Sequence, residues 1–394
     1  MLRLRAVALH DDQVQRWAHA AAVVGSRAVL FGGLGGPKHQ RLDDVWTLDM
    51  VGAVDEWRWR AQSTVGEGPS KRMHHSAVAI GAELWVFGGR NSPAQPYNDL
   101  HAIDVAASPP RWCRLCGNSE KGEGENSPCP RWRHAAASVR VGGADAMAVF
   151  GGRDAEALVA PELFLFTASS SGSRGWRRCG LDGPIAARHS HNLVAWGEGT
   201  LLVVGGADAE MRPLDGVVSV RLGGSGGEPA RVGPLELRPP LPGRLSAAAC
   251  VEGDRLFVLG GCTDRLLGWG RALAVVELGG RTWRYLRMEE PDPRGCGALW
   301  INHAAFAAAG SLVVAGGGGT CFSFGTHFDP ALAVYPLPEP PTETATEAAT
   351  EAAPGEATPA EATHGDEPCA HAACLGAAAA ALAFAQHWLV RGVS

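Results

Sequence analysis

Four residues between positions 113 and 134 are of the types that bind zinc. The segment CRLC contains Cys113 and Cys116, and Cys129 and His134 follow it. Thiolates and an imidazole at such spacing are typical of a tetrahedral zinc site. However, His134 also belongs to a repeated pattern described below, and the first two cysteines flank a predicted outer strand. We therefore expect no metal site here, nor in the HGDEPCAHAAC stretch of residues 364–374.

A second candidate for chemistry is the stretch GGGGTCFSFGTHFDP, residues 316–330. A glycine run can bind phosphate, but a phosphate-binding loop also needs a Lys-Ser/Thr pair and a following helix, which the sequence lacks. Cys321 or Ser323 can act as a nucleophile with His327 as a base, yet no orienting acid or oxyanion donor is evident. Phe322 and Phe324 alternate as anchoring residues do. We therefore expect a rigid loop and no catalytic residue.

A repeat explains the first two of these glycines. Apolar runs ending in a glycine pair recur along the chain, and their first glycines are Gly32, Gly88, Gly151, Gly205, Gly260 and Gly316. The spacings between them are 56, 63, 54, 55 and 56 residues. Regular periods of this length indicate a repeat architecture. Gly316 and Gly317 are therefore expected to form the turn of the last repeat.

An Arg-x-x-His pattern precedes most of the glycine pairs. Its arginines are Arg16, Arg72, Arg131, Arg188 and Arg244, and its histidines are His19, His75, His134, His191 and His303. The fifth copy has Ala247 in place of the histidine, and the sixth has Trp300 in place of the arginine. These side chains can form a cationic ring that binds a phosphate or carboxylate. Alternatively, they satisfy backbone carbonyls inside each repeat, which we favour because a residue in every repeat usually serves the repeat.

Each repeat offers four short β-type runs separated by Gly, Pro and Asp, which is the pattern of one propeller blade. We predict an all-β fold, a six-bladed Kelch-type β-propeller over residues 1–337 with four antiparallel strands in each blade. The sixth repeat lacks a fourth strand before the proline-rich stretch, so we predict that residues 2–9 supply it and close the ring. Residues 338–374 are expected to be a disordered Ala/Thr/Glu/Pro linker, and residues 375–394 a short apolar helix.

The net charge of −6 is not spread evenly along the chain. Residues 1–337 carry 33 acidic and 34 basic side chains, so the charge of this part does not by itself indicate nucleic-acid binding. No signal peptide or apolar run long enough to span a membrane is evident, and the ten cysteines are irregularly spaced. We expect a cytoplasmic protein with reduced thiols.

The glycine pairs and spaced aromatic residues resemble Kelch repeats. Two stretches are further similar to the Kelch segment of the tRNA wybutosine-synthesising proteins, including their plant-type fusions. The matching positions are Gly89, Arg90, Ser92 and Pro93 in the second repeat, and Gly316, Gly317, Gly318, Gly319, Cys321, Phe322, Ser323, Phe324 and Gly325 in the sixth. This resemblance suggests that these two loops, together with His327, carry a family-specific role.

The resemblance implies tRNA modification. The family completes wybutosine, a tricyclic base beside the anticodon of phenylalanine tRNA, by methylation and methoxycarbonylation. In some members a methyltransferase half that uses S-adenosylmethionine precedes the Kelch half. This chain begins almost at the first repeat and has no Rossmann-type motif, so we expect the catalytic half to be absent and no cofactor to bind this chain.

Two hypotheses for function follow. In the first, the propeller is a component of wybutosine synthesis that binds phenylalanine tRNA or an enzyme of that pathway. In the second, it is a Kelch adaptor that binds a protein through its inter-blade loops and has no role with tRNA. The fold alone does not choose between them, because function depends on the loops.

Overall fold

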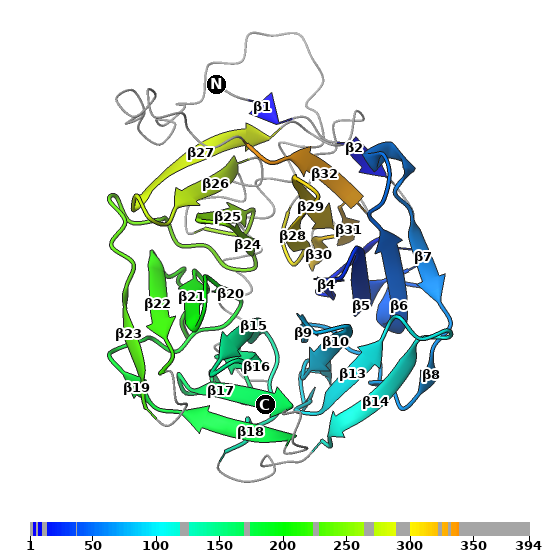
Figure 1. Ribbon diagram of the computed structural model, residues 1–394, viewed down its shortest axis with the longest axis horizontal. Helices are drawn as coiled ribbons and strands as arrows, with labels where there is room; N and C mark the ends of the chain where they lie inside the picture. The colour runs from blue at the N-terminus through cyan, green and yellow to red at the C-terminus, as the bar shows by residue number, and fades with distance from the viewer. Residues whose placement is uncertain are drawn as a thin grey trace.

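The computed structural model describes residues 3–4, 7–9, 14–36, 38–118, 126–168, 174–223, 228–263, 272–288, 300–321, 325–329 and 332–338. These residues form six four-stranded blades around a central axis, so the predicted six-bladed propeller is confirmed (Figure 1). The helical structure in the described residues is one 3-10 turn, Val54–Glu56. In this part of the chain no helix is long and apolar enough to cross a membrane.

Blades 1 to 3 follow one another along the chain, each from its inner to its outer strand. Blade 1 contains β4 (Ala20–Val24), β5 (Arg27–Gly35), β6 (Gln40–Asp49) and β7 (Trp59–Gln62). Blade 2 contains β9 (Ser76–Ile80), β10 (Glu83–Phe87), β13 (Leu100–Asp104) and β14 (Arg111–Cys116). Blade 3 contains β15 (Ala135–Val141), β16 (Ala144–Phe150), β17 (Leu163–Ala168) and β18 (Arg174–Cys179).

Blades 4 to 6 complete the circle. Blade 4 contains β20 (Asn192–Ala195), β21 (Thr200–Val204), β22 (Val217–Arg221) and β23 (Ala230–Pro234). Blade 5 contains β24 (Ala248–Glu252), β25 (Arg255–Leu259), β26 (Ala272–Glu277) and β27 (Thr282–Met288). Blade 6 contains β28 (Ala304–Ala308), β29 (Ser311–Ala315), β32 (Leu332–Pro336) and β2 (Val7–Leu9).

The N-terminal residues close the last blade, as the sequence predicts. Val7–Leu9 pairs antiparallel with β32 and forms the outer strand of blade 6. The predicted single strand over residues 2–9 is divided, however, because β1 (Arg3–Leu4) pairs in parallel with β27 of blade 5. Two other parallel edge strands, β8 (Val65–Gly66) and β19 (Leu181–Asp182), extend blades 2 and 4 in the same way. These short strands cover outer edges that would otherwise expose unpaired backbone groups.

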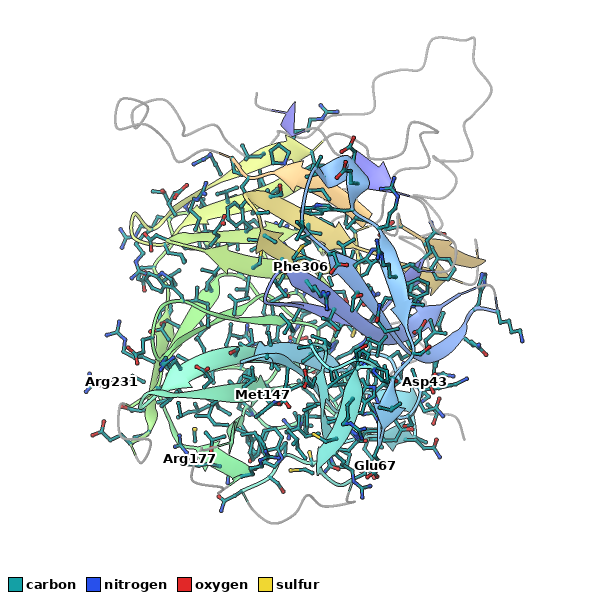
Figure 2. The ribbon with its side chains drawn as sticks, turned by 45° about the vertical axis from the view of Figure 1, so that its right-hand side comes forward. Asp43, Glu67, Met147, Arg177, Arg231 and Phe306 are labelled. Carbon is teal, nitrogen blue, oxygen red and sulfur yellow. The ribbon has the colours of Figure 1, made fainter. Side chains whose placement is uncertain are left out.

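Packing between neighbouring blades forms the hydrophobic core. After its first one or two residues, the second strand of each blade has an apolar run, because its side chains alternate between the two neighbouring blades. In β5, for example, Leu30 packs toward blade 6 with Val313, and Phe31 packs toward blade 2 with Trp112. Figure 2 shows Met147 and Phe306 within this interior and Arg231 and Glu67 at the outer rim. One buried apolar cluster therefore fills each of the six interfaces.

Several predictions fall on residues that the structure does not describe. The predicted linker and helix lie outside the described residues, apart from Pro338, and so do Phe322, Ser323 and Phe324. The described part of the sixth glycine run agrees with its predicted role, since Gly316 and Gly317 end β29 at φ values of 55° and 124°.

Candidate binding face around the central channel

The five repeated arginines are buried and bonded within their own blades. Each guanidinium donates a hydrogen bond to the carbonyl of the first glycine of the pair in the same blade. The N···O distances are 3.1 Å for Arg16, 2.9 Å for Arg72, 3.2 Å for Arg131, 2.9 Å for Arg188 and 3.3 Å for Arg244. These contacts are the ones expected if the arginines satisfy backbone carbonyls inside each repeat. Binding of a ligand by these side chains remains a prediction.

In blades 1 and 2 a carboxylate neutralises the arginine. Arg16 donates to both oxygens of Asp44, at 2.6 and 3.0 Å, and Arg72 donates to both oxygens of Asp99, at 2.7 and 2.8 Å. The Arg72 guanidinium and its hydrogen bonds hold the pKa of Asp99 well below its usual range, against the effect of burial. A bidentate pair of this kind fixes both charges, in the interior for Arg72 and Asp99 and at the surface side for Asp44, which is 37% exposed.

The backbone of the same arginines joins each blade to the one before it. The second glycine of each pair donates its N–H to the carbonyl of the arginine in the next blade. The N···O distance is 2.9 Å for Gly33 to Arg72, and Trp300 supplies the carbonyl for Gly261 at the same distance. Both glycines of a pair have positive φ, as at Gly32 (64°) and Gly33 (93°), a conformation that favours glycine. The glycine pair is therefore an inter-blade joint.

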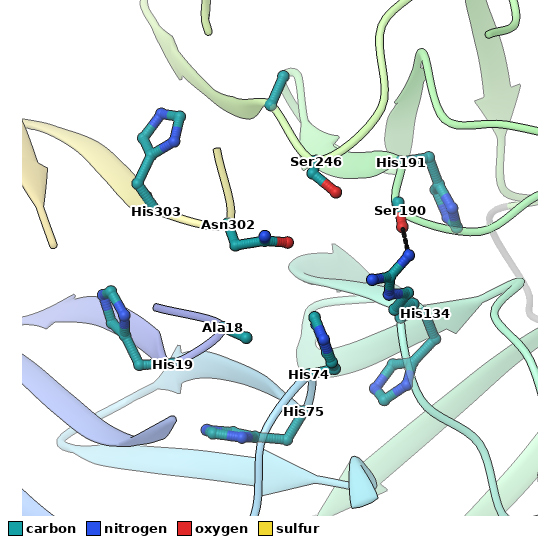
Figure 3. A pocket seen from close by; sticks show the side chains of 12 residues that line it. Ala18, His19, His74, His75, His134, Ser190, His191, Ser246, Asn302 and His303 are labelled. Carbon is teal, nitrogen blue, oxygen red and sulfur yellow. Dashed lines mark hydrogen bonds between the residues drawn. The ribbon is translucent and has the colours of Figure 1, made fainter. Parts of the chain in front are cut away.

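The repeated histidines point away from the axis, between blades (Figure 3). His75 donates from Nε2 to the carbonyl of Phe31, at 3.1 Å, and packs edge-on against the Phe31 ring. A Cβ on Gly32 would lie 2.9 Å from Cε1 of His75, so the glycine leaves room for the imidazole. Burial and the nearby Arg72 charge lower the pKa of His75 to about 3. The pKa values of the other four histidines are lowered in the same direction, mainly by burial, so all five are neutral at pH 7.

A closed ring of backbone hydrogen bonds lines the channel. The residue before each repeated histidine, or before Ala247, donates its N–H to the equivalent carbonyl of the preceding blade at 2.8–3.0 Å. The six members are Ala18, His74, Arg133, Ser190, Ser246 and Asn302. All have φ between 51° and 57°, which directs their side chains to the axis (Figure 3). With the six residues that follow them they enclose a cavity of about 110 Å³.

Both loops that resemble the wybutosine family form hairpins at this end of the channel. β11 (Arg90–Ser92) pairs with β12 (Gln95–Pro96), and β30 (Gly318–Cys321) pairs with β31 (Gly325–Phe328). Each hairpin directly follows a glycine pair, and Arg90 and Gly318 bond through their backbones to Met73 and Ile301, just before the ring. The sequence alone did not show that the two loops share one face of the propeller.

Cys113, Cys116, Cys129 and His134, the zinc candidates among the described residues, are not brought together as a metal site. The His134 imidazole shares a hydrogen bond of 2.9 Å with the Ser76 hydroxyl, and the Cys129 sulfur accepts one from Arg131 at 3.3 Å. No group of three or more His, Cys, Asp or Glu side chains that can hold a metal ion occurs among the described residues. In the sixth-blade hairpin, Cys321 pairs with Gly325 and His327 with Gly319.

The sequence analysis missed a group of arginines at the channel mouth. Besides Arg90, which belongs to a family-like loop, the group contains Arg41, Arg133 and Arg153. Arg90 and Arg133 stack on Trp132, and the charges of Arg41 and Arg153 act on Arg90. Trp132 and Arg133 are the two variable residues between the constant Arg131 and His134. The variable pair in each Arg-x-x-His copy was the available signal, because the constant residues are buried.

Comparison with known proteins assigns the chain to a family. The sequence model described as tRNA wybutosine-synthesizing protein 4, beta-propeller, matches residues 69–331, more than half of the chain. A model of the KLHDC2/KLHL20/DRC7 Kelch-repeats domain matches residues 5–121. These matches agree with the Kelch-type arrangement of the blades.

The sequence identity to individual relatives is low. The chain is 26% identical to human tRNA wybutosine-synthesizing protein 4 over 261 residues, which is 63% of this chain and 36% of that protein. It is 26% identical to Adagio-like protein 1 of Oryza sativa subsp. japonica over 322 residues, 76% of this chain and 47% of that protein. The matches thus span about a third and about half of these relatives. On the strength of the family model, the chain belongs to the beta-propeller family of tRNA wybutosine-synthesizing protein 4.

Proposed function

We propose that this propeller is a binding component of wybutosine biosynthesis, acting on phenylalanine tRNA at the late methylation and methoxycarbonylation stage. The observation that carries the proposal is the family match over residues 69–331. The human protein and that of Gibberella zeae, to which the chain is 22% identical over 276 residues, are both named for wybutosine synthesis.

The arrangement of the channel face supports a binding role. The hairpins β11–β12 and β30–β31 rise beside the same ring of backbone bonds, so a ligand at the channel mouth can contact both. The ring positions present different side chains, including His74, Arg133, Ser190 and Asn302, on a backbone that repeats from blade to blade. A uniform scaffold with variable side chains is suited to recognition.

S-adenosylmethionine does not fit the described residues. A nucleotide site of the Rossmann type needs a glycine-rich turn from a strand into an α-helix. Within the described ranges, the glycine pairs follow β-strands or, in blade 1, lie within one, and the N–H of the second glycine of each pair is used by the neighbouring blade. We therefore derive no transfer step from this chain and assign it the positioning of tRNA or of a partner enzyme.

The test is disruption of the gene that encodes this chain, followed by mass spectrometry of nucleosides from purified phenylalanine tRNA. We expect wybutosine to be lost and an earlier intermediate to accumulate, with recovery on re-expression of residues 1–394. An unchanged amount of wybutosine would refute the proposal. In vitro, the purified chain should bind the anticodon stem-loop that carries the modified base more tightly than the unmodified one, in a salt-sensitive manner.

A second candidate function is that of a protein-binding adaptor. The match of residues 5–121 to a Kelch-repeats domain favours it. Under this alternative, wybutosine is unchanged after gene disruption, and a protein partner is retained by the wild-type propeller but lost when the β11–β12 and β30–β31 hairpins are shortened.

A further inference from the structure

Four arginines of blades 1 to 3 gather at one side of the channel mouth without acidic partners. They are Arg41 on β6, Arg90 on β11, Arg133 in the backbone ring and Arg153. Within the described part of the chain, none of them forms a salt bridge, and Nε of Arg41, Arg90 and Arg133 is buried without a hydrogen-bond acceptor. Buried donors without acceptors are uncommon in folded proteins and point to a missing partner.

Trp132 holds two of these guanidinium groups close together. The guanidinium carbon of Arg90 lies 3.6 Å from the centre of the Trp132 ring, and that of Arg133 lies 5.2 Å from it. The indole is fixed by a hydrogen bond from its Nε1 to the Asp154 carbonyl, at 3.1 Å. Since a stacked guanidinium uses its π face, its N–H groups remain available in the plane for an oxyanion.

The carboxylates near this arginine group are already engaged. Asp154 accepts hydrogen bonds at Oδ1 from the backbone N–H groups of Glu156 and Ala157, at 2.8 and 2.7 Å. Asp208 accepts from Nε of Arg212 at 2.7 Å. Neither replaces the role that Asp44 has for Arg16 or Asp99 for Arg72. The positive charge at the mouth is therefore not compensated from within the described residues.

The charge state of the group reflects this arrangement. Burial, together with the neighbouring arginine charges, lowers the pKa of Arg90 and of Arg133 to about 10. Both side chains nevertheless stay protonated at pH 7. Like charges held together in a partly buried place repel one another, so an anion bound between them relieves a cost that the free protein bears.

We propose that Arg41, Arg90, Arg133 and Arg153, organised by Trp132, form a binding site for a phosphate group at the channel mouth. In blades 1 and 2, one carboxylate suffices for one guanidinium, whereas several neighbouring guanidinium groups suit a group with more oxygens and more charge. The adjoining cavity adds the Ser190 hydroxyl, which accepts from Arg133 at 3.5 Å, and the Asn302 amide.

Two sources can supply this phosphate: an RNA backbone or a small phosphorylated molecule. The assignment to RNA rests on the proposed function, whereas the phosphate site itself does not. Binding of inorganic phosphate and pyrophosphate, and separately of the phenylalanine tRNA anticodon stem-loop, distinguishes these sources. Each is measured by calorimetry on the full chain at low ionic strength.

The variants are Arg90→Gln and Arg133→Gln, with Arg231→Gln as a control. Arg231 is exposed on the outer strand β23 and its loss removes the same charge far from the mouth (Figure 2). We expect each mouth variant to weaken pyrophosphate binding about tenfold, since a charge-assisted hydrogen bond contributes that much. The control should change it less than about twofold. Phosphate should also raise the thermal midpoint of the wild-type chain more than that of Arg90→Gln at the same phosphate concentration.

The binding measurements distinguish an RNA ligand, a small phosphorylated ligand and the absence of a phosphate site. If the stem-loop is weakened along with pyrophosphate, and its salt dependence falls by about one phosphate contact, the site binds the RNA backbone. If only pyrophosphate is weakened, the site is supported and its ligand is a small phosphorylated molecule, while the wybutosine assay still decides the proposed function. Absence of phosphate binding by the wild-type chain, or equal loss in Arg231→Gln, would overturn the inference.

Discussion

The arginines inside the blades and those at the channel mouth share a side chain but differ in their surroundings. Arg72 is buried, donates to the Gly88 carbonyl and is paired with Asp99. Arg90 lies on the face of Trp132 and has a buried Nε without an acceptor. The first arrangement satisfies the donors and the charge within the protein, whereas the second leaves both unsatisfied. Surroundings, more than residue type, therefore indicate which arginines stabilise the fold and which are available to a ligand.

The largest expected effect comes from breaking the interior pair. Arg72→Met leaves the Asp99 carboxylate, whose side chain is 11% exposed, without its bidentate partner. Asp99 keeps a hydrogen bond to His101 Nε2 at 3.0 Å, so we expect the free energy of unfolding to fall by about 3 kcal/mol, the lower end of the cost of breaking a buried ion pair. Denaturant unfolding measures it. The double variant Arg72→Met/Asp99→Asn should recover part of the loss, and an Arg72→Met chain as stable as the wild type would contradict the structural role.

A smaller effect is expected from the buried histidines on acidification. Because the folded pKa of His75 is lowered to about 3, its proton is taken up first by the unfolded chain as the pH falls below about 6.5. Stability contributed by the neutral imidazole is complete above that pH and is lost as the pH falls toward 3. Between these pH values, each such histidine adds about 1.4 kcal/mol per pH unit to the decrease in the free energy of unfolding.

The test compares the wild type with His75→Gln by denaturant unfolding between pH 6.5 and 4.5. The variant should lose stability less steeply on acidification, by roughly the contribution of one histidine. Identical slopes would show that the imidazole is not held neutral in the folded chain. The comparison sharpens the contrast between interior and mouth, because His75 lies against Phe31 in the same joint that Arg72 stabilises.

The smallest effect on stability is expected at the mouth. Among the described residues Arg90 forms no salt bridge that Arg90→Gln would remove, and the substitution relieves repulsion among the neighbouring arginines. We expect the free energy of unfolding to change by less than about 0.5 kcal/mol or to increase slightly. Denaturant unfolding in phosphate-free buffer is the measurement. A loss comparable to that of Arg72→Met would remove the distinction between the two groups of arginines.

Much of the fold was predictable because small and apolar residues mark each repeat in the sequence. The first glycine of each pair, from Gly32 to Gly316, marks a place where a Cβ would meet the next blade, so the blade number can be counted in the sequence. Closure by the N-terminus followed from the missing fourth strand of the sixth repeat. The division of residues 2–9 between blades 5 and 6 was not predictable, because edge strands of two and three residues carry little pattern.

The site was less predictable than the fold. The spacing of Arg72 and His75 indicates which end of the blade they share, but it does not indicate that both are buried and bonded to the backbone. Arg133 and Arg153 are 20 residues apart in sequence and belong to one cluster only because Trp132 pairs with Arg153 across the blade. Non-local contacts of this kind depend on the tertiary fold and have no counterpart in a local motif.

The hydrogen-bonded circuit through Ala18, His74, Arg133, Ser190, Ser246 and Asn302 has no first or last member, since Asn302 accepts from Ala18 as each other residue accepts from its neighbour. All six blade junctions are therefore equivalent in their backbone hydrogen bonds around the axis. The place where the polypeptide is cut is therefore interchangeable among them. A circularly permuted chain opened between blades 3 and 4 would preserve every link, whereas excision of a whole blade would leave a donor and an acceptor that no neighbour can reach.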